Sequence, residues 1–575
     1  ITLSNDNESG IHGVIIPKFT ARNGSHKFRF AIDFGTTNTH IEYSVDGSTS
    51  SNPFDITEKD MQIQKLHITD DYMINDVFNS DFIPATIGGE SLYGYPMRTV
   101  ISESNNTNWD KAVLAMANVN IPYTYEKSLS LPYNVLHTDL KWSTNTEDKK
   151  RASKYIESIL LMLRTKVLLN NGDLSKTEIV WFYPASMTQN RFNKFKAEWE
   201  NTFATLFGAP ISNIIAASES VAPYYYHKAK KGATSTVVSV DIGGGTTDVL
   251  IVDKGEPKYL TSFRFAANTI FGDGYSYDSD SNGFVNKYKD IITNQLETNN
   301  LRGLKAVLKS VLDKRVSTDV IAFLFSLASN KEIKKEKVEI NFAKMLADDN
   351  RGKYVVILFY VAIVYHIAKL MKAKGFDMPR HMTFSGNGSK VLNILSTNDA
   401  TLVRLTKIIF EEIYAQSYSI DGLDIIRPAN SKESTCKGGI ILTPFQSQDY
   451  GEIKDMKTIL IGTDNEKFAD VHMTYNDVTE ADLDSVVDVI KEYIEFTFKL
   501  DKKFSFYDNF DVDRSIMNKV KDLCYRDIRT YLENGLAIKK SEIAQDGADD
   551  NLEETLFFYP LVGIINAVVR NIYQM

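Results

Sequence analysis

The sequence predicts an α/β fold built from two similar halves, and the first observation behind this prediction is a pattern that occurs twice. Residues 31–47 and 240–255 each contain an apolar strand that ends in Asp-x-Gly, a turn of small and hydroxyl-bearing residues, a second strand and a closing glycine turn. This order is typical of a β-hairpin. The second observation is the length of 575 residues, which is enough for several domains. Two related lobes therefore suit the chain better than one domain.

The two turns, a first turn at residues 35–38 and a second turn at 243–246, have residues suited to binding phosphate. Glycine lets the backbone approach an anion without a Cβ in the way, and successive N–H groups in such a turn can cradle the anion. The strand-end carboxylates, Asp33 and Asp241, would repel phosphate, so their natural partner is a hydrated Mg2+ on a nucleotide. We therefore expect ATP or ADP, with Mg2+, in a cleft between the halves.

Other phosphate-binding patterns do not compete with this interpretation. The sequence contains no Gly-x4-Gly-Lys-Ser/Thr loop, and Gly243-x-Gly245-x-x-Asp248 lacks the third small residue of a dinucleotide-binding fingerprint. The simplest alternative is that both segments are ordinary hairpins with glycine turns. That alternative explains one copy better than it explains a matched pair.

Asp33-x-Gly-Thr-Thr-Asn and Asp241-x-Gly-Gly-Gly-Thr-Thr-Asp resemble the two phosphate motifs of the actin/DnaK/sugar-kinase ATPase superfamily. The match looks closest to DnaK-type heat-shock chaperones and bacterial actin-like proteins. Three later segments follow in the superfamily's order: residues 214–224 are similar to the first connecting motif, 382–390 to the adenosine motif and 436–442 to the second connecting helix. The resemblance implies the two-lobed actin-like ATPase fold, in which duplicated ribonuclease-H-like lobes carry inserted outer subdomains.

The resemblance covers about residues 28–445 and divides the chain into four parts. These parts are a flexible or edge lead (1–27), a first lobe (28–235, with 48–140 as an inserted outer subdomain), a second lobe (236–445, with 275–350 as a helical inserted subdomain) and a mainly helical C-terminal extension (446–575).

The C-terminal extension has no counterpart in the superfamily that we recognise. Residues 481–494, 513–536 and 553–573 have the apolar spacing of helices with broad apolar faces. No flexible Gly/Ser or Pro-rich linker separates them from Gly439, so we expect the extension to pack on the ATPase body. The linker and β-sandwich with which the chaperones hold peptides are not evident, which puts chaperone activity in doubt.

The resemblance also implies roles for individual residues. The nucleotide-binding set is Asp33, Gly35, Thr36, Thr37, Asn38, Gly243, Gly244, Gly245, Thr246, Thr247, Gly386, Asn387 and Gly388. Asp33, Asp241 and Glu219 would hold Mg2+, mostly through water. Asp241 or Thr246 would orient the attacking water.

Lys141 is the best-placed lysine to face the γ-phosphate, and with Asp241, Thr246 and Glu219 it completes the catalytic set. It departs from the chaperone pattern, because Trp142 stands where arginine usually follows the lysine, and a plain surface lysine is the alternative. Glu219 also departs from that pattern, because Ser220 stands where the chaperones have proline.

Composition restricts the function classes. The net charge of −9 leaves no basic surplus to neutralise nucleic-acid phosphates, so we expect no nucleic-acid partner. The two cysteines, Cys436 and Cys524, favour a reducing, cytoplasmic setting without a disulfide framework. Residues 354–370 are the most apolar stretch, but they contain His366 and Lys369. They fall short of the roughly 18–20 unbroken apolar residues of a membrane span, so we expect a core helix there.

Three functions suit this resemblance. The first is a slow ATPase that acts as a nucleotide switch and controls a protein partner by opening and closing its lobes. The second is an actin-like filament former, in which the partner is another copy of the chain. The third is a small-molecule kinase, which is least favoured because the three-glycine second motif is typical of the ATPases and no substrate-binding acid can be singled out.

Overall fold

The computed structural model describes most of the chain. The described residues are 2–4, 12–14, 24–64, 83, 86–88, 95, 97–105, 107–122, 134–138, 140–142, 146–184, 187, 189–231, 236–275, 282–419, 422–428, 431–442, 473–546, 552 and 554–575. Most of the expected lead (1–27), part of the expected first insertion (48–140) and the start of the expected C-terminal extension (446–472) lie outside them. In the lead, β1 (Thr2–Ser4) pairs with β2 (His12–Val14).

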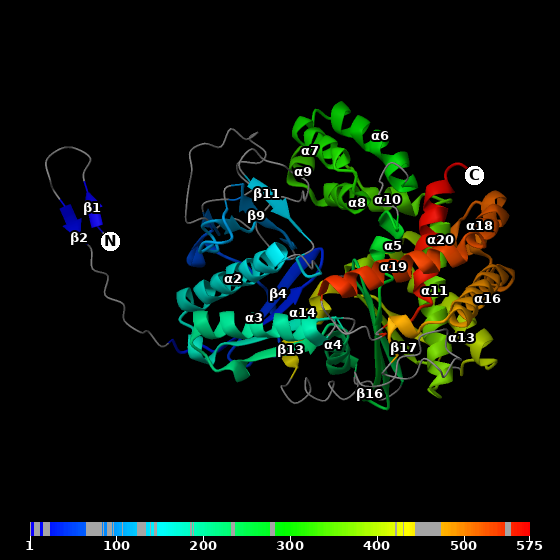
Figure 1. Ribbon diagram of the computed structural model, residues 1–575, viewed down its shortest axis with the longest axis horizontal. Helices are drawn as coiled ribbons and strands as arrows, with labels where there is room; N and C mark the ends of the chain where they lie inside the picture. Colours follow the sequence, from blue (N-terminus) through cyan, green and yellow to red (C-terminus); the bar gives the residue numbers. More distant parts are fainter. Residues whose placement is uncertain are drawn as a thin grey trace.

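The first lobe is built on a six-stranded sheet (Figure 1). Its strands lie in the order β13 (Ile214–Ser218), β12 (Glu178–Tyr183), β3 (Phe28–Phe34), β4 (Asn38–Val45) and β5 (Asn52–Pro53), with β8 (Met97–Arg98) beside β4. β3 and β4 form an antiparallel hairpin, whereas β12 is parallel to β3 and β13 is parallel to β12. Helices α2 (Thr146–Leu169) and α3 (Gln189–Phe207) share one buried core with this sheet.

The second lobe repeats this sheet. Its strands lie in the order β18 (Asp424–Ile426), β17 (His381–Ser385), β14 (Val237–Ile242), β15 (Thr247–Asp253) and β16 (Glu256–Phe263). β14 and β15 form the antiparallel hairpin, β16 extends it, and β17 and β18 run parallel to β14. Each pair of neighbouring strands in this order is parallel or antiparallel in the same way as the corresponding pair in the first lobe. The prediction of a two-lobed α/β fold is therefore confirmed.

Two helices lie between the sheets and join the lobes: α4 (Val221–Lys231) and α14 (Ser431–Ile441). A Cβ on Gly438 of α14 would collide with the carbonyl oxygen of Ala222 in α4, so only glycine permits this close crossing. Arg29 of β3 donates to the carbonyl oxygen of Gly439 at 3.1 Å and also to that of Leu442. The end of the second lobe is thus attached to the first sheet.

Short strands and further helices complete the two lobes. In the first lobe these are β6 (Gln62–Ile63), β7 (Thr86–Ile87), β9 (Ile101–Ser104), β10 (Val119–Asn120) and β11 (Asn134–His137). In the second lobe they are α5 (Ala267–Phe271), α6 (Gly283–Thr298), α7 (Arg302–Asp313), α8 (Ser317–Ser326), α9 (Lys331–Lys335), α10 (Phe342–Ala347), α11 (Lys353–Ala373), α12 (Leu392–Leu395) and α13 (Asp399–Tyr414). Helices α6 to α10 form a group on one side of the second sheet (Figure 1).

Helix α11 is the core of the second lobe. It is the one helix among the described residues that is long and apolar enough to pass for a membrane span, and nearly all of it is buried within the protein. His366 of this helix stacks on Phe557 with ring centroids 5.4 Å apart and meets Phe263 edge-on at 5.6 Å. These contacts are those of a core histidine.

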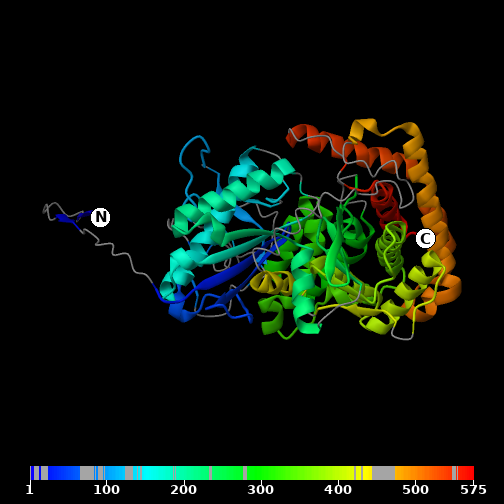
Figure 2. The ribbon, with the colours of Figure 1, turned by 90° about the horizontal axis from the view of Figure 1, so that it is seen from below.

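The C-terminal extension wraps the second lobe. Its helices are α16 (Glu480–Phe504), α17 (Phe506–Phe510), α18 (Met517–Cys524), α19 (Ile528–Asp546) and α20 (Phe558–Asn571). Figure 2 shows α16 to α19 along the outer edge of the molecule and α20, in red, inside them. The Tyr493 hydroxyl donates to the carbonyl oxygen of Leu358 at 2.6 Å, and Phe558 stacks on Phe263 at 4.0 Å.

One helix expected in the extension is interrupted. The spacing over residues 513–536 predicts a single helix, but α18 ends at Cys524 and α19 begins at Ile528. Asp527 lies in the left-handed region with φ of 54°, which ends a helical run. The prediction of one continuous helix is wrong, because Val520 and Cys524 before the break and Leu532 after it are all buried in one core that a straight helix would not follow.

Candidate nucleotide site

A cavity of about 820 Å³ lies between the lobes, at the carboxyl ends of β3, β14 and β17. The predicted residues that line it are Asp33, Gly35, Thr36, Thr37, Asn38, Lys141, Glu219, Asp241, Gly243, Gly244, Gly245, Thr246, Gly386, Asn387 and Gly388. The carboxyl ends of strands are where open α/β sheets bind ligands. Residues from two duplicated hairpins thus share one cavity.

Thr247 is the exception among the predicted nucleotide-binding residues. It is fully buried, and its hydroxyl donates to the carbonyl oxygen of Phe265 at 2.6 Å. Because side chains alternate along a strand, Thr246 faces the cavity while Thr247, the first residue of β15, faces the core of the second lobe. Its role is therefore to hold the segment between β16 and α5 in place.

The second turn is held from behind by α5. The Gly243 N–H donates to the carbonyl oxygen of Thr246 at 2.8 Å, and the Gly244 carbonyl accepts from the Asn268 N–H at 2.8 Å. Since C=O and N–H of a trans peptide point in opposite directions, the Gly245 N–H points away from α5. Such an N–H is available to an anion between the lobes.

The first turn is held by residues that the sequence patterns did not single out for it. The Thr99 hydroxyl donates to the carbonyl oxygen of Gly35 at 2.6 Å, and the Thr99 N–H donates to that of Thr37 at 2.9 Å. The Trp142 indole Nε1–H donates to the Thr36 hydroxyl at 2.9 Å. Residues 99 and 142 lie far from the turn in sequence, so no local motif indicates these contacts.

Asp241 is positioned by two hydroxyl groups. The Ser385 hydroxyl, at the end of β17, donates to Asp241 Oδ2 at 3.2 Å, and the Thr435 hydroxyl, from α14, donates to the same oxygen at 3.4 Å. Asp33 and Asp241 are 7% and 8% exposed, so both carboxylates are nearly buried at the cavity wall. Thr435 also lines the cavity, and sequence reasoning missed it.

Lys141 and Glu219 form an ion pair on the cavity wall. The Lys141 ammonium donates to Glu219 Oε1, and the side chains are only 3% and 15% exposed. Arg191 of α3 holds the backbone here, because its Nη2 donates to the Lys141 carbonyl oxygen at 2.7 Å. Lys141 is therefore not a surface lysine, and that alternative is wrong. Arg98 of β8 lines the same cavity and is the second cationic side chain that the described residues of the first lobe contribute to its wall.

Two glycines bring the segment after β17 against the second turn. Gly386 has φ of 78°, a conformation that favours glycine. A Cβ on Gly386 would collide with Asp241 Oδ1, and a Cβ on Gly388 would collide with the carbonyl oxygen of Gly243. Only glycine therefore fits at these two positions beside β14 and the second turn. This close approach places Asn387 in the cavity wall.

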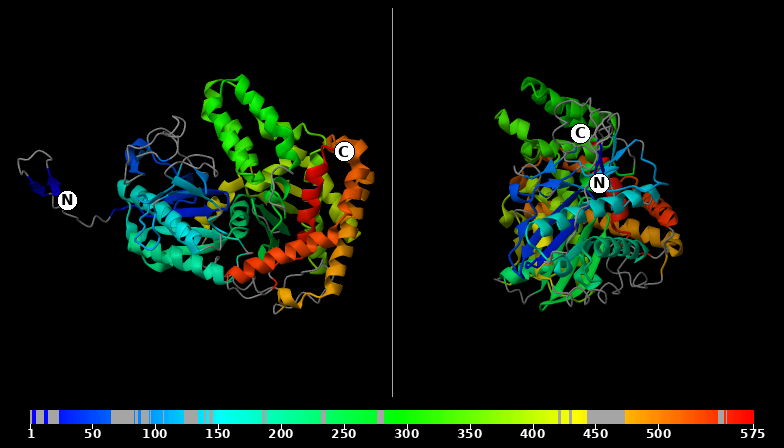
Figure 3. Two further views of the ribbon diagram at one scale, coloured as in Figure 1. Left: turned by 45° about the horizontal axis from the view of Figure 1, so that its top comes forward. Right: turned by 90° about the vertical axis from the view of Figure 1, so that its left-hand side faces the viewer.

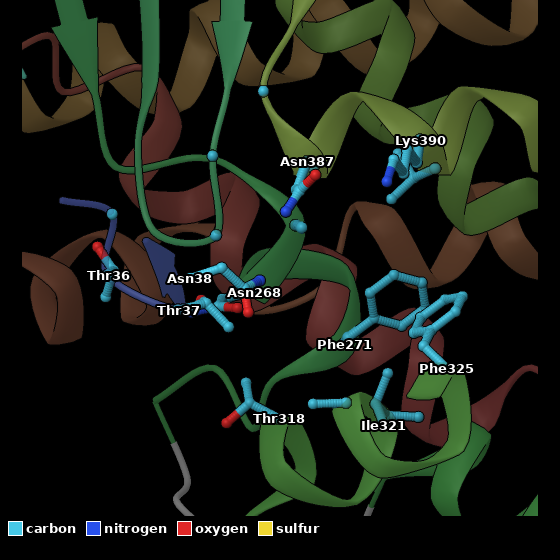
Figure 4. Close-up of a pocket in the computed structure, with 18 of the residues that line it drawn as sticks. Thr36, Thr37, Asn38, Asn268, Phe271, Thr318, Ile321, Phe325, Asn387 and Lys390 are labelled. Carbon is cyan, nitrogen blue, oxygen red and sulfur yellow. The ribbon is translucent and has the colours of Figure 1, made fainter. Parts of the chain in front are cut away.

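The far end of the cavity is apolar. Phe271 of α5 and Ile321 and Phe325 of α8 lie together there, away from the first turn (Figure 4). Asn387 and Lys390, from the segment after β17, lie on another wall of the same cavity. In the sequence, these apolar side chains carry only the pattern of core helices, so no motif indicated that they line a site.

No protein-family model matches the sequence, and no curated protein matches it either. Solved structures that the comparison finds similar include the following two. MreB5 of Spiroplasma citri bound to ADP is 12% identical with a TM-score of 0.31, and the match covers 74% of this chain and 98% of that chain. The ethanolamine utilization protein EutJ from Carboxydothermus hydrogenoformans is 10% identical with a TM-score of 0.30, over 72% of this chain and 90% of that chain.

The assignment of the fold depends on the chain itself. The repeated sheets, the two hairpin turns and the connecting helices α4 and α14 define the two-lobed fold of the actin/DnaK/sugar-kinase ATPase superfamily. That DnaK-type chaperones are the members of this superfamily most similar to the chain stays a prediction.

Proposed function

We propose that the chain binds Mg2+-ATP and Mg2+-ADP between its lobes and hydrolyses ATP slowly. The observation that supports this proposal is that two matched hairpin turns, one from each duplicated sheet, line one cavity of about 820 Å³. That volume lies within the roughly 300–1,000 Å³ usual for small-molecule sites. In this proposal the phosphates lie between the first and second turns, and the nucleoside extends toward Phe271 and Phe325.

The carboxylates of the cavity are suited to a hydrated magnesium ion. Asp33, Asp241 and Glu219 all line it, and among the described residues no three His, Cys, Asp or Glu side chains are close enough together to ligate a metal directly. Mg2+ usually keeps several water ligands and takes one or two carboxylates together with phosphate oxygens, so this arrangement is compatible with it. When bound, the ion neutralises charge on the β- and γ-phosphates.

Hydrolysis in this site would depend on positioning and charge neutralisation, because phosphoryl transfer to water leaves the protein little covalent chemistry to perform. Asp241, fixed by Ser385 and Thr435, would orient the attacking water together with Thr246. Lys141 would face the γ-phosphate, and Glu219 would hold the lysine in place. The N–H groups of the second turn would stabilise the negative charge that develops on the phosphate oxygens.

Calorimetry with Mg2+-ATP and Mg2+-ADP tests nucleotide binding. We expect saturable heat with both and a rise in melting temperature. A ligand at a hundred times its Kd stabilises the folded protein by about 2.7 kcal/mol. No heat and no thermal shift with either nucleotide would overturn the proposal. Release of phosphate without an added acceptor would support the ATPase activity and disfavour a small-molecule kinase.

We further propose that nucleotide operates the protein as a switch that controls a protein partner. A ligand held by both lobes shifts the molecule toward the closed form only if it binds that form more tightly. Small-angle scattering should therefore differ between the nucleotide-free, ADP and ATP-analogue states, and superimposable curves would contradict the switch. Sedimentation with and without ATP separates the switch from the alternative, a filament that pellets when nucleotide is bound.

A further inference from the structure

Trp142 lies beside the first turn and contacts residues of both lobes. Its indole N–H donates to the Thr36 hydroxyl at 2.9 Å. Two guanidinium groups approach its ring: Arg191 of the first lobe at 5.3 Å from the ring centroid, and Arg264 of the second lobe at 5.8 Å. Both lie within the roughly 6 Å at which a cation is attracted to an aromatic face. Trp142 therefore connects the first turn to a residue of the opposite lobe.

Arg264 is held in turn by the C-terminal extension. It lies between β16 and α5, and its backbone N–H donates to Glu554 Oε2 at 3.0 Å. Its guanidinium donates to Glu542 of α19. Glu554 is itself fixed, because Lys539 lies 3.3 Å from its Oε1 and the Tyr559 hydroxyl donates to that oxygen at 3.0 Å. Figure 3 shows α19 extending from the outer edge of the second lobe toward the first.

The Glu554 carboxylate is held in its charged form. Burial alone would raise the pKa of Glu554, but the positive charges of Lys539 and Arg264, together with hydrogen bonds from the Arg264 N–H and the Tyr559 hydroxyl, hold that pKa below its usual value. Glu554 is almost fully buried, so it is a fixed anchor rather than a mobile surface carboxylate. A continuous series of contacts thus runs from the extension through Arg264 and Trp142 to Thr36.

We propose that Trp142 is a positioning residue for the first turn and that the C-terminal extension controls its position through Arg264. The extension would then regulate nucleotide binding, because a change in its docking moves a contact of the turn that receives the phosphates. The inference rests on the proposed function, since the first turn matters in this way only if it binds nucleotide. An event that frees Glu542 or Glu554 from Arg264 should weaken nucleotide affinity without touching the cavity.

Full-length variants test this inference. Arg264→Met removes the guanidinium, Arg264→Lys keeps a cation, and Trp142→Phe keeps an aromatic ring but removes the N–H donor. Arg529→Met is the matched control, because Arg529 is another arginine bonded to acidic residues, but it and its partners Glu480 and Asp484 all belong to the extension. Circular dichroism and melting temperature establish that each variant is folded before Kd and turnover are measured.

We expect Arg264→Met and Trp142→Phe each to weaken Mg2+-ADP affinity by about three- to tenfold, the usual effect of losing one hydrogen bond or cation–π contact. Arg264→Lys should fall between Arg264→Met and the native chain, and Arg529→Met should keep the native Kd. Because Arg264 reaches the first turn only through the Trp142 N–H in this inference, the double variant should lose less than the product of the two single losses. A native Kd for Arg264→Met, or losses that multiply, would overturn the inference.

Fluorescence gives a second measurement that needs no nucleotide. The chain has four tryptophans, so subtracting the Trp142→Phe spectrum from the native one isolates the emission of Trp142. That emission should shift in nucleotide-free Arg264→Met and Glu542→Gln and remain unchanged in Arg529→Met. If the native chain binds no nucleotide, the proposed function fails. The contact between Arg264 and Trp142 is then tested by the Trp142 emission alone. An unshifted Trp142 emission in Arg264→Met would overturn the inference that Arg264 controls the position of Trp142.

Discussion

Gly244 of the second turn and Thr37 of the first turn face one another across the boundary between the lobes. A Cβ added to Gly244 would lie 2.8 Å from the Thr37 hydroxyl oxygen, a separation that real Cβ atoms essentially never show. The two turns therefore approach one another as closely as a glycine allows. The distance between the two turns therefore sets the width of the space in which the nucleotide phosphates would lie.

Gly244→Val should abolish or greatly weaken nucleotide binding. The side chain would force the two turns apart, and an overpacked contact of this kind typically costs about 1–3 kcal/mol, or roughly ten- to a hundredfold in affinity. Calorimetry with Mg2+-ADP measures the loss. Thr37→Ala removes the hydroxyl that the valine would meet, so the double variant should melt at a higher temperature than Gly244→Val alone. A folded Gly244→Val protein with native affinity would place the phosphates elsewhere.

Asp241→Asn should reduce ATP hydrolysis far more than ATP binding. The change keeps the shape but removes a charge that acts on water and metal, so we expect kcat to fall by about a hundredfold or more while Kd changes by less than tenfold. Thr435→Val, which removes one hydrogen bond to Asp241, should reduce kcat by a smaller factor. Intact turnover with lost affinity would reverse the role assigned to Asp241.

The parts of the site that the sequence predicted are those encoded in short segments. Each turn is a local pattern in which glycines, hydroxyl residues and a strand-end aspartate stand within a few positions, so Gly244 and Asp241 are recognisable without knowing the fold. Thr247 shows the limit of such a pattern. It belongs to the motif, yet the alternation of β15 turns it into the core.

The parts that the sequence did not predict depend on distant contacts. Trp142 reaches Thr36 through the fold of the first lobe, and it reaches Arg264 only because the two lobes fold against one another. Nothing near residue 142 in the sequence indicates either contact. Phe271 and Phe325 have the spacing of core residues and become cavity walls through the placement of α5 and α8. The break at Asp527 has no glycine or proline to indicate it, because packing of the extension imposes it.

His366 should make the protein less stable in mild acid. Burial lowers the pKa of His366 from 6.5 to about 3, so below pH 6.5 the unfolded chain binds a proton that the native protein does not. The free energy of unfolding therefore falls as the pH decreases from 6.5 toward 3, by up to about 1.4 kcal/mol per pH unit from this group. His366→Phe should remove that contribution, and urea denaturation between pH 7.5 and 5 measures it.

The control for this prediction is Val364→Ala, a change in the same buried helix that removes no titratable group. It should leave the pH dependence of the unfolding free energy nearly parallel to the native one. The difference between His366→Phe and the native chain should instead grow as the pH falls below 6.5. Equal pH dependence in the His366→Phe and native proteins would show that the buried histidine is not the source of acid sensitivity.

Truncation at about residue 446 should destabilise the whole protein rather than release an independent module. The extension covers α11 and the end of β16: Phe558 stacks on Phe263, Phe557 on His366, and Tyr493 donates to the Leu358 carbonyl. Removing it would expose these apolar surfaces, and contiguous patches of this kind cause association in water. We expect a lower melting temperature or aggregation, measured by calorimetry and gel filtration.

The same truncation should also weaken nucleotide binding in any soluble fraction, because Arg264 loses Glu542 and Glu554 and no longer holds Trp142 beside the first turn. Removal of residues 1–23, the part of the lead before the first lobe, is the matched control and should leave affinity and melting temperature at native values. A soluble, monodisperse truncated chain with native melting temperature and native affinity would show that the extension is a separate domain with no part in the site.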